Sequence, residues 1–286
     1  MVIRRWVLAA VMLAVPEWCA AGAWLQEPGT AYGRLSAGYL STQRRFDENG
    51  DSRPFLAGGG FRDVGYQDLD LGLYTELGLH PRWNLLANVL WKHVEAEQPS
   101  AVFTTWGWSD LSVGLKGLVW RGTSSVVSGV GVLVFPLGYD PGEYPSLGSS
   151  VNEAHLGLQA GTSTSRFWAN TEAWFKVRGG DLRNQVAGAV TAGVGSGGRF
   201  GLRVEARGEV PAGSAASVGS TVRFDPNLAD PSTLDLASTL SFRVVPRLAV
   251  EAEVRGTVWG ENTLDGTRFY LALATGAPLR LWGGAP

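Results

Sequence analysis

Histidine is the side chain of this sequence best suited to acid–base chemistry, and the chain contains three, His80, His93 and His155. A histidine that activates a serine could act as the general base of a hydrolase embedded in a membrane. His80 flanks a Pro-Arg pair, His93 follows a tryptophan and a lysine, and His155 alternates with Glu153. No serine lies in a recognisable nucleophile motif beside any of them. We therefore predict that the protein is not an enzyme, with a lipid hydrolase as the least favoured alternative.

Two further motifs could bind a ligand. Residues 193–198 read Gly-Val-Gly-Ser-Gly-Gly and satisfy the dinucleotide-binding pattern G-x-G-x-x-G. An alternating segment follows them instead of a helix, so we interpret the glycines as a tight turn. Residues 47–51, Asp-Glu-Asn-Gly-Asp, offer oxygens to calcium but lack the remaining spacing and the closing glutamate of a calcium loop. We expect an Asn-Gly turn there, and no cofactor or metal.

The strongest pattern in the sequence is the segment 68–95, where two runs of strict alternation flank a Pro-Arg pair. Leucine or threonine occupies the odd positions from 69 to 79, and the odd positions from Trp83 to Trp91 are apolar. A period of two predicts a β-hairpin with one apolar face. Tryptophans near both ends of such a face are typical of membrane interfaces, and the rise from Trp83 to Trp91, roughly 19 Å, approaches the height of the apolar band of a membrane barrel.

The N-terminus has the pattern of a secretory signal peptide over residues 1–23. A basic pair at positions 4 and 5 precedes an apolar segment, and a stretch of small residues ends at Ala23. Cleavage there would remove Cys19, the only cysteine, and leave residues 24–286 as a single barrel domain. Charged residues make up 17% of the chain, with 24 Lys+Arg against 26 Asp+Glu. The chain therefore lacks the basic footprint of a nucleic-acid-binding protein.

Alternation of the same kind predicts ten more strands. They cover about residues 30–45, 110–119, 125–137, 153–160, 169–178, 185–195, 199–210, 234–244, 247–258 and 267–275. The breaks after even strands are short, whereas those after odd strands, such as 47–60, 98–109, 139–150 and 211–232, are mostly long. This is expected when short turns face the periplasm and long loops face outward. Twelve strands leave roughly 22 residues for each strand and its connection, whereas sixteen would leave too few.

We thus predict an all-β fold: a transmembrane antiparallel up-and-down β-barrel of about twelve strands, with ten or fourteen as alternatives, in the outer membrane of a Gram-negative cell. The polar strand faces would line its lumen. The candidate lumen residues are Asp68, Asp70, Tyr74, Glu76, Lys116, Glu153, Glu172, Trp174, Lys176, Arg203, Glu205, Arg207, Glu251, Glu253 and Arg255. Both signs of charge are interleaved, so salt bridges could partly close the lumen or border a narrow conduit.

Aromatic residues also fall on or near the inward register, namely Tyr74, Phe135, Trp168 and Trp174. They could accommodate an aromatic or apolar solute, although packing inside the barrel explains them equally well.

Three stretches carry a family resemblance. Residues 39–54 read Tyr-Leu-Ser-Thr-Gln-Arg-Arg-Phe-Asp-Glu-Asn-Gly-Asp-Ser-Arg-Pro, residues 108–118 read Trp-Ser-Asp-Leu-Ser-Val-Gly-Leu-Lys-Gly-Leu, and residues 136–161 contain Pro-Leu-Gly-Tyr and Ser-Leu-Gly. Together they resemble the outer-membrane transporter family associated with meta-pathway phenol degradation. The chain departs from that family at Ser109, where a glycine is usual, and at its C-terminus, which does not end on an aromatic residue.

The resemblance implies a monomeric or loosely associated barrel that lets small hydrophobic compounds cross the outer membrane, and it supplies no catalytic or ligand residues. We expect a passive transporter or channel for small solutes, with hydrophobic or aromatic ones favoured. The alternative is a non-conducting structural or surface-displayed barrel. The expected partners are outer-membrane lipid, the small-molecule solute, the periplasmic chaperones and the outer-membrane assembly machinery. We expect no nucleic acid as a partner.

Overall fold

The structure is a computed structural model that describes residues 22–55, 65–98, 101–140, 142–195, 199–213, 230–275 and 279–280. The predicted signal peptide lies outside the described residues except for its last two, and most of the predicted loop 211–232 lies outside them as well.

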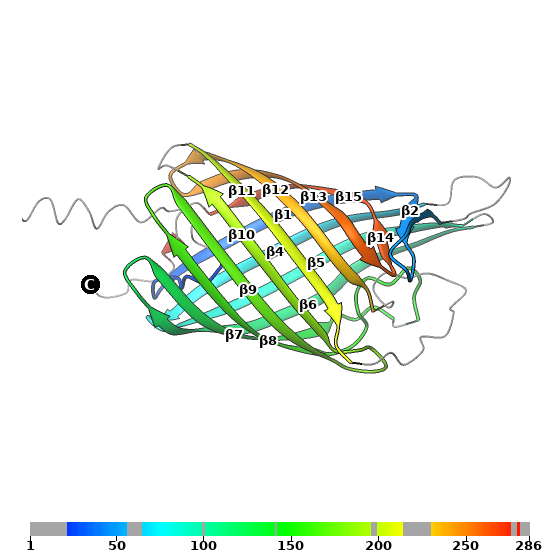
Figure 1. Cartoon of the computed structure of the whole chain (residues 1–286), viewed down its shortest axis with the longest axis horizontal. Helices are drawn as coiled ribbons and strands as arrows, with labels where there is room; N and C mark the ends of the chain where they lie inside the picture. The colour runs from blue at the N-terminus through cyan, green and yellow to red at the C-terminus, as the bar shows by residue number, and fades with distance from the viewer. Residues whose placement is uncertain are drawn as a thin grey trace, which may run out of the picture.

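Twelve long strands form a closed antiparallel barrel (Figure 1), which confirms the predicted class and strand number. They are β1 (Thr30–Thr42), β4 (Tyr66–His80), β5 (Trp83–Gln98), β6 (Ala101–Arg121), β7 (Ser125–Pro136), β8 (Glu153–Ser163), β9 (Phe167–Arg178), β10 (Gln185–Val194), β11 (Phe200–Pro211), β12 (Ser232–Val245), β13 (Leu248–Glu261) and β15 (Thr267–Ala274). Each pairs with the next along the chain, and β1 pairs with β15 to close the wall. The short strand β16 (Leu279–Arg280) pairs with the first residues of β1.

Strand alternation places apolar side chains on the outer wall and polar ones in the lumen, as β4 illustrates. Leu71 on the outer wall is 46% exposed in the isolated chain, whereas the neighbouring Asp70 in the lumen is only 3% exposed. This distribution inverts that of a water-soluble domain and fits a barrel whose outer wall contacts lipid. Across the described ranges, no helix is both long and apolar enough to span a membrane.

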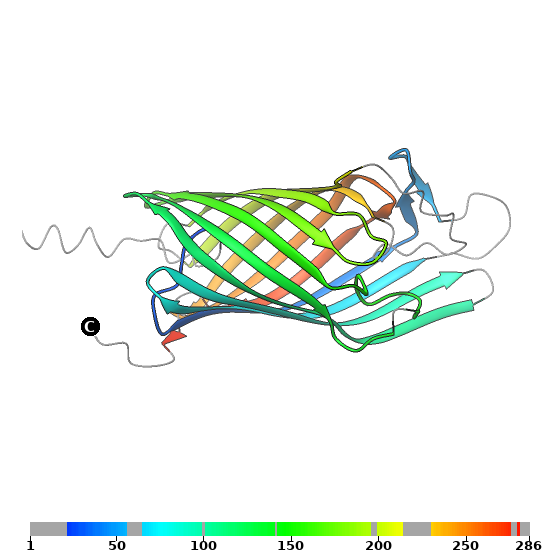
Figure 2. The ribbon, with the colours of Figure 1, turned by 90° about the horizontal axis from the view of Figure 1, so that it is seen from below.

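One predicted loop is wrong. Gln98 and residues 101–109 are in strands and not in a loop: β5 continues to Gln98 and β6 begins at Ala101, so both strands project beyond the barrel as a two-stranded ribbon (Figure 2). Along β6 the ribbon exposes every second side chain from Val102 to Trp108, and threonine and glycine interrupt the apolar pattern there. Trp106, for example, is 69% exposed.

A small second sheet lies at the same end of the barrel. It pairs β14 (Thr263–Asp265) with β2 (Arg44–Phe46), and β2 with β3 (Ser52–Pro54). The predicted first strand is therefore split after Thr42, and the predicted loop 47–60 contains a short strand. This sheet and the mouth of the barrel lie opposite the end that carries the short turns (Figure 1).

Candidate functional site

A network of ion pairs joins the lumen faces of β1, β11 and β13. The Arg34 guanidinium contacts Glu251 at 3.0 Å and Glu253 at 3.4 Å, and Arg203 contacts Glu253 at 3.2 Å. Arg255 completes the network, at 2.9 Å from Glu253 and 3.3 Å from Glu205 on β11. These strands lie on both sides of the seam between β1 and β15, so the network ties the two ends of the sheet together across this seam.

A second cluster lies on the neighbouring wall. Arg268 of β15 holds Asp68 at 2.6 Å and Asp70 at 2.9 Å, and Lys92 lies 4.0 Å from Asp68. Arg268 is not among the predicted lumen residues. The signal was available, because polar Arg268 and Tyr270 alternate with apolar residues along 267–274.

A third pair is almost completely removed from solvent. Lys116 Nζ lies 2.7 Å from a Glu76 carboxylate oxygen, and both side chains are 1% exposed. The Tyr74 hydroxyl also donates a hydrogen bond to Glu76. Two charges buried this deeply are costly unless each satisfies the other, so this pair fixes β4 against β6.

Between these clusters the lumen contains a cavity of about 450 Å³, whose walls come from β4 to β11. Among the predicted lumen residues, its walls include Tyr74, Glu172, Trp174, Lys176, Arg203, Glu205 and Arg207, and Trp168 lies there as well. The charged groups are paired: Arg207 contacts Glu172 at 3.4 Å and Glu205 at 3.3 Å, and Lys176 contacts Glu209. The wall therefore presents aromatic surface next to charge that is largely neutralised.

One aromatic residue lies on the opposite face of the wall from the one predicted. Phe135 was predicted on or near the inward register, but it lies on the outer wall and is 40% exposed. It shares that face with Leu133 and pairs with Leu111, so it contributes to the lipid-facing surface. Glu153, another predicted lumen residue, lies on β8 between His155 at 2.7 Å and Arg178 at 3.1 Å.

The N-terminal strap, residues 22–29, crosses the lumen at the short-turn end. It leads into β1, yet the Trp24 ring lies against Gly161 of β8 and Ala23 N donates to Asn170 Oδ1 of β9 at 3.0 Å, on the opposite side of the barrel. Near β1, Gly29 N donates to Gly78 O at 2.8 Å. Cleavage after Ala23 would remove the contact to Asn170 and leave those of Trp24 and Gly29. The strap narrows this end of the lumen.

The opposite end is narrowed by the mouth loop, residues 137–140 and 142–152. Tyr139 and Leu147 of this loop are buried against inward side chains of β1, β4 and β5. The Tyr139 hydroxyl donates to Asp110 Oδ1 at 2.6 Å, and Ser109 Oγ donates to Leu147 O at 2.6 Å. Burial and the bond to Asp110 raise the pKa of Tyr139, which keeps the phenol protonated as a donor.

The arrangement offers little for catalysis. His93 and His155 each contact a glutamate two residues away on the same strand, Glu95 and Glu153, which supplies no nucleophile. Within the described ranges, no three His, Cys, Asp or Glu side chains are grouped so that they could hold a metal ion. What the geometry offers is a lumen cavity between two narrowed ends.

Comparison with known proteins bears on the fold. No family model and no curated protein matches the sequence. Among solved structures, an outer membrane channel from Pseudomonas putida F1 aligns over 88% of this chain and 97% of that chain, with a TM-score of 0.69 and 12% identity. The fold is that of outer-membrane channels. The NanC porin aligns over 85% of this chain and 98% of that chain, with a TM-score of 0.51 and 8% identity.

Proposed function

We propose that the protein is a passive channel of the outer membrane for small solutes, with aromatic or hydrophobic ones favoured. The observation that carries this proposal is the lumen cavity of about 450 Å³, which places Tyr74, Trp168 and Trp174 beside paired charges. Aromatic faces offer stacking surface to a solute, and neutralised charges leave no strong field to repel an uncharged one.

Two further observations support the proposal. One solved structure with this fold is an outer membrane channel, and three stretches of the sequence resemble the transporter family associated with meta-pathway phenol degradation. Membership of that family is part of the proposal, as are the periplasmic position of the short turns and the lack of enzymatic activity. The groups that we expect to shape the passage are Lys116, Glu172, Lys176, Arg203, Glu205 and Arg207.

A non-conducting structural barrel is the second candidate. The observation that favours it is the narrowing of the lumen by ion pairs, the N-terminal strap and the mouth loop. Such a barrel would display its ribbon and small sheet to the outside and pass no solute.

Solute flux into liposomes that carry the folded protein separates the two. We expect phenyl glucoside, an uncharged aromatic solute, to enter faster than through empty liposomes. Its rate relative to arabinose and potassium chloride should be higher for the parent protein than for a Trp174→Ala variant. Trp106→Ala serves as the matched control, because Trp106 lies on the external ribbon. If none of the three solutes crosses faster than through empty liposomes, even after Glu205 and Arg207 are neutralised together, the channel proposal fails and the structural candidate replaces it.

A further inference from the structure

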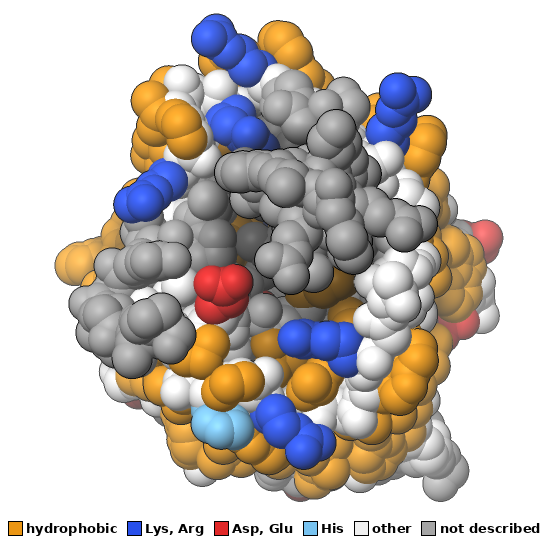
Figure 3. Space-filling view, turned by 90° about the vertical axis from the view of Figure 1, so that its left-hand side faces the viewer, with side chains coloured by type: hydrophobic (Ala, Val, Ile, Leu, Met, Phe, Trp, Pro, Cys, Tyr) orange, Lys and Arg blue, Asp and Glu red, His pale blue; other side chains and the backbone are white. Residues whose placement is uncertain are grey.

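Each of the five short connections between strands carries an arginine. They are Arg82, Arg121, Arg166, Arg199 and Arg247, and all five are exposed. None of them forms an ion pair with a residue that the structure describes. Figure 3 shows this end of the barrel, where Lys and Arg side chains surround the rim and outnumber Asp and Glu. The short-turn end therefore presents a ring of positive charge, which we call the arginine ring.

Every arginine of this ring is next in sequence to an apolar side chain on the outer wall. These neighbours are Trp83, Trp120, Phe167, Phe200 and Leu248, which are between 36% and 64% exposed. Aromatic residues at the edge of an apolar belt lie at the level of lipid headgroups, and arginines just beyond them reach the phosphates. Each arginine is thus one residue away from the edge of the lipid-facing belt.

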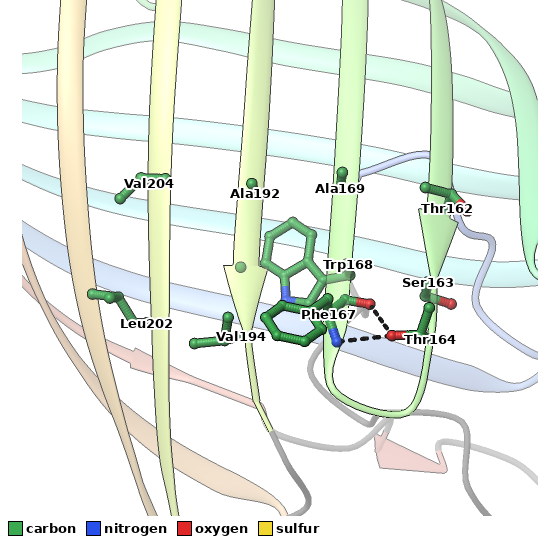
Figure 4. Close-up of a pocket in the computed structure, with 11 residues that line it drawn as sticks. Thr162, Ser163, Thr164, Phe167, Trp168, Ala169, Ala192, Val194, Leu202 and Val204 are labelled. Carbon is green, nitrogen blue, oxygen red and sulfur yellow. Dashed lines mark hydrogen bonds between the residues drawn. The ribbon is translucent and has the colours of Figure 1, made fainter.

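A hollow in the outer wall lies between two of these arginines. It measures about 360 Å³ and is bordered by Phe167, Ala169, Ala192, Val194, Leu202 and Val204 (Figure 4). The turn from β8 to β9 also borders the hollow, through Thr162, Ser163 and Thr164. Within this turn, Thr164 Oγ1 accepts a hydrogen bond from Phe167 N at 3.1 Å. Gly195 N donates to Arg166 O at 3.0 Å, so this turn is fixed against the end of β10. Arg199 then leads into β11 on the other side of the hollow.

We propose that the short-turn end binds anionic glycerophospholipids of the adjacent leaflet, and that one such lipid occupies this hollow. Its acyl chain would lie between Phe167 and Val204, and its phosphate would accept hydrogen bonds from Arg166 and Arg199. Guanidinium groups suit this role because their paired N–H donors match phosphate oxygens. An acidic protein would also be attracted to the ring, but it would not explain why each arginine adjoins a lipid-facing apolar residue. The inference rests on membrane insertion and not on transport, so it holds whether or not the barrel conducts.

Native mass spectrometry of the folded, detergent-solubilised protein tests the proposal. The protein is mixed with equal amounts of phosphatidylglycerol and phosphatidylcholine, and the retained lipids are counted. We expect phosphatidylglycerol to be preferred by about five-fold for each arginine that it engages. The variant Arg166→Gln/Arg199→Gln should lose most of this preference. Ala192→Phe should also weaken retention, because the ring fills the hollow while both arginines remain.

The matched control is Arg44→Gln/Arg53→Gln, which removes two arginines from the small sheet at the opposite end and should leave the preference unchanged. Heat-modifiable gel mobility checks that every variant is folded. Equal retention of both lipids by the parent protein, or full preference in the Arg166→Gln/Arg199→Gln variant, would overturn the proposal. So would binding of soluble polyglutamate in place of phosphatidylglycerol, since the ring would then face an acidic protein. Solute flux is measured separately, so that a failure of the channel proposal is not mistaken for a failure of this one.

Discussion

Replacing Lys116 by methionine should destabilise the barrel strongly, because it leaves the Glu76 carboxylate without its cation. Both side chains are 1% exposed, and their charged atoms lie 2.7 Å apart. Removing one partner of a buried pair typically costs about 3 to 5 kcal/mol. Glu76 would keep the hydrogen bond from the Tyr74 hydroxyl. We therefore expect the lower end of that range, about 3 kcal/mol.

The double variant Lys116→Met/Glu76→Gln should cost less than either single variant, because no uncompensated charge remains. The assay is urea unfolding of the protein in phospholipid vesicles, followed by heat-modifiable gel mobility. Arg44→Met provides the control: Arg44 and its partner Asp265 are 51% and 26% exposed, and the loss of such a pair should cost about 0 to 1 kcal/mol. If Lys116→Met costs no more than the control, or if the double variant costs the sum of the singles, the pair does not stabilise the lumen as argued.

Three more outcomes are expected. Leu71→Arg, which puts a charge on the lipid-facing wall, should destabilise the barrel by about 2 to 4 kcal/mol in the same urea assay. Gly161→Val should displace the Trp24 ring, because this ring lies 2.5 Å from the position of the added Cβ. We expect the displacement to raise conductance in planar bilayers. Gly208→Val is the control and should leave conductance unchanged, because the nearest atom to its added Cβ is 3.6 Å away. A cysteine in place of Glu143 should react with an impermeant reagent on intact cells, whereas a cysteine in place of Arg121 should react only after permeabilisation.

The sequence is enough to predict the barrel because lipid imposes a strict requirement on each strand. Where the outer wall meets lipid, apolar and polar residues alternate, so the hairpin of β4 and β5 and the register of Leu71 and Asp70 were predicted correctly. Alternation alone therefore assigns each strand residue to the lumen side or to the lipid side, even when the strands on the far side of the barrel are unknown. Strand count followed from spacing alone.

What the sequence did not reveal depends on contacts between distant segments. Residues 101–109 mix threonine, glycine and serine with apolar residues, so the apolar–polar alternation is weak there and a strand was mistaken for a loop. The ion pair of Arg268 with Asp68 forms because β15 pairs with β1 and closes the barrel. The sequence of either strand alone does not indicate this long-range pairing. The sequence of the strap has no periodicity that would indicate its position. The strap fits against the wall because Gly161 and Gly78 have no side chain where it passes.

The strap also bears on how the barrel can be built and handled. Trp24 stands just before the first strand, but its binding surface is on β8, so it can dock only once this strand, the sixth of the twelve wall strands along the chain, is in place. Contacts between segments so far apart along the chain form slowly, because a long loop must close first. Docking of the strap is therefore a late event that follows wall assembly. A purification tag fused ahead of Trp24 would have to thread out of the lumen past Gly161, whereas one inserted into the ribbon between β5 and β6 would not meet the lumen at all.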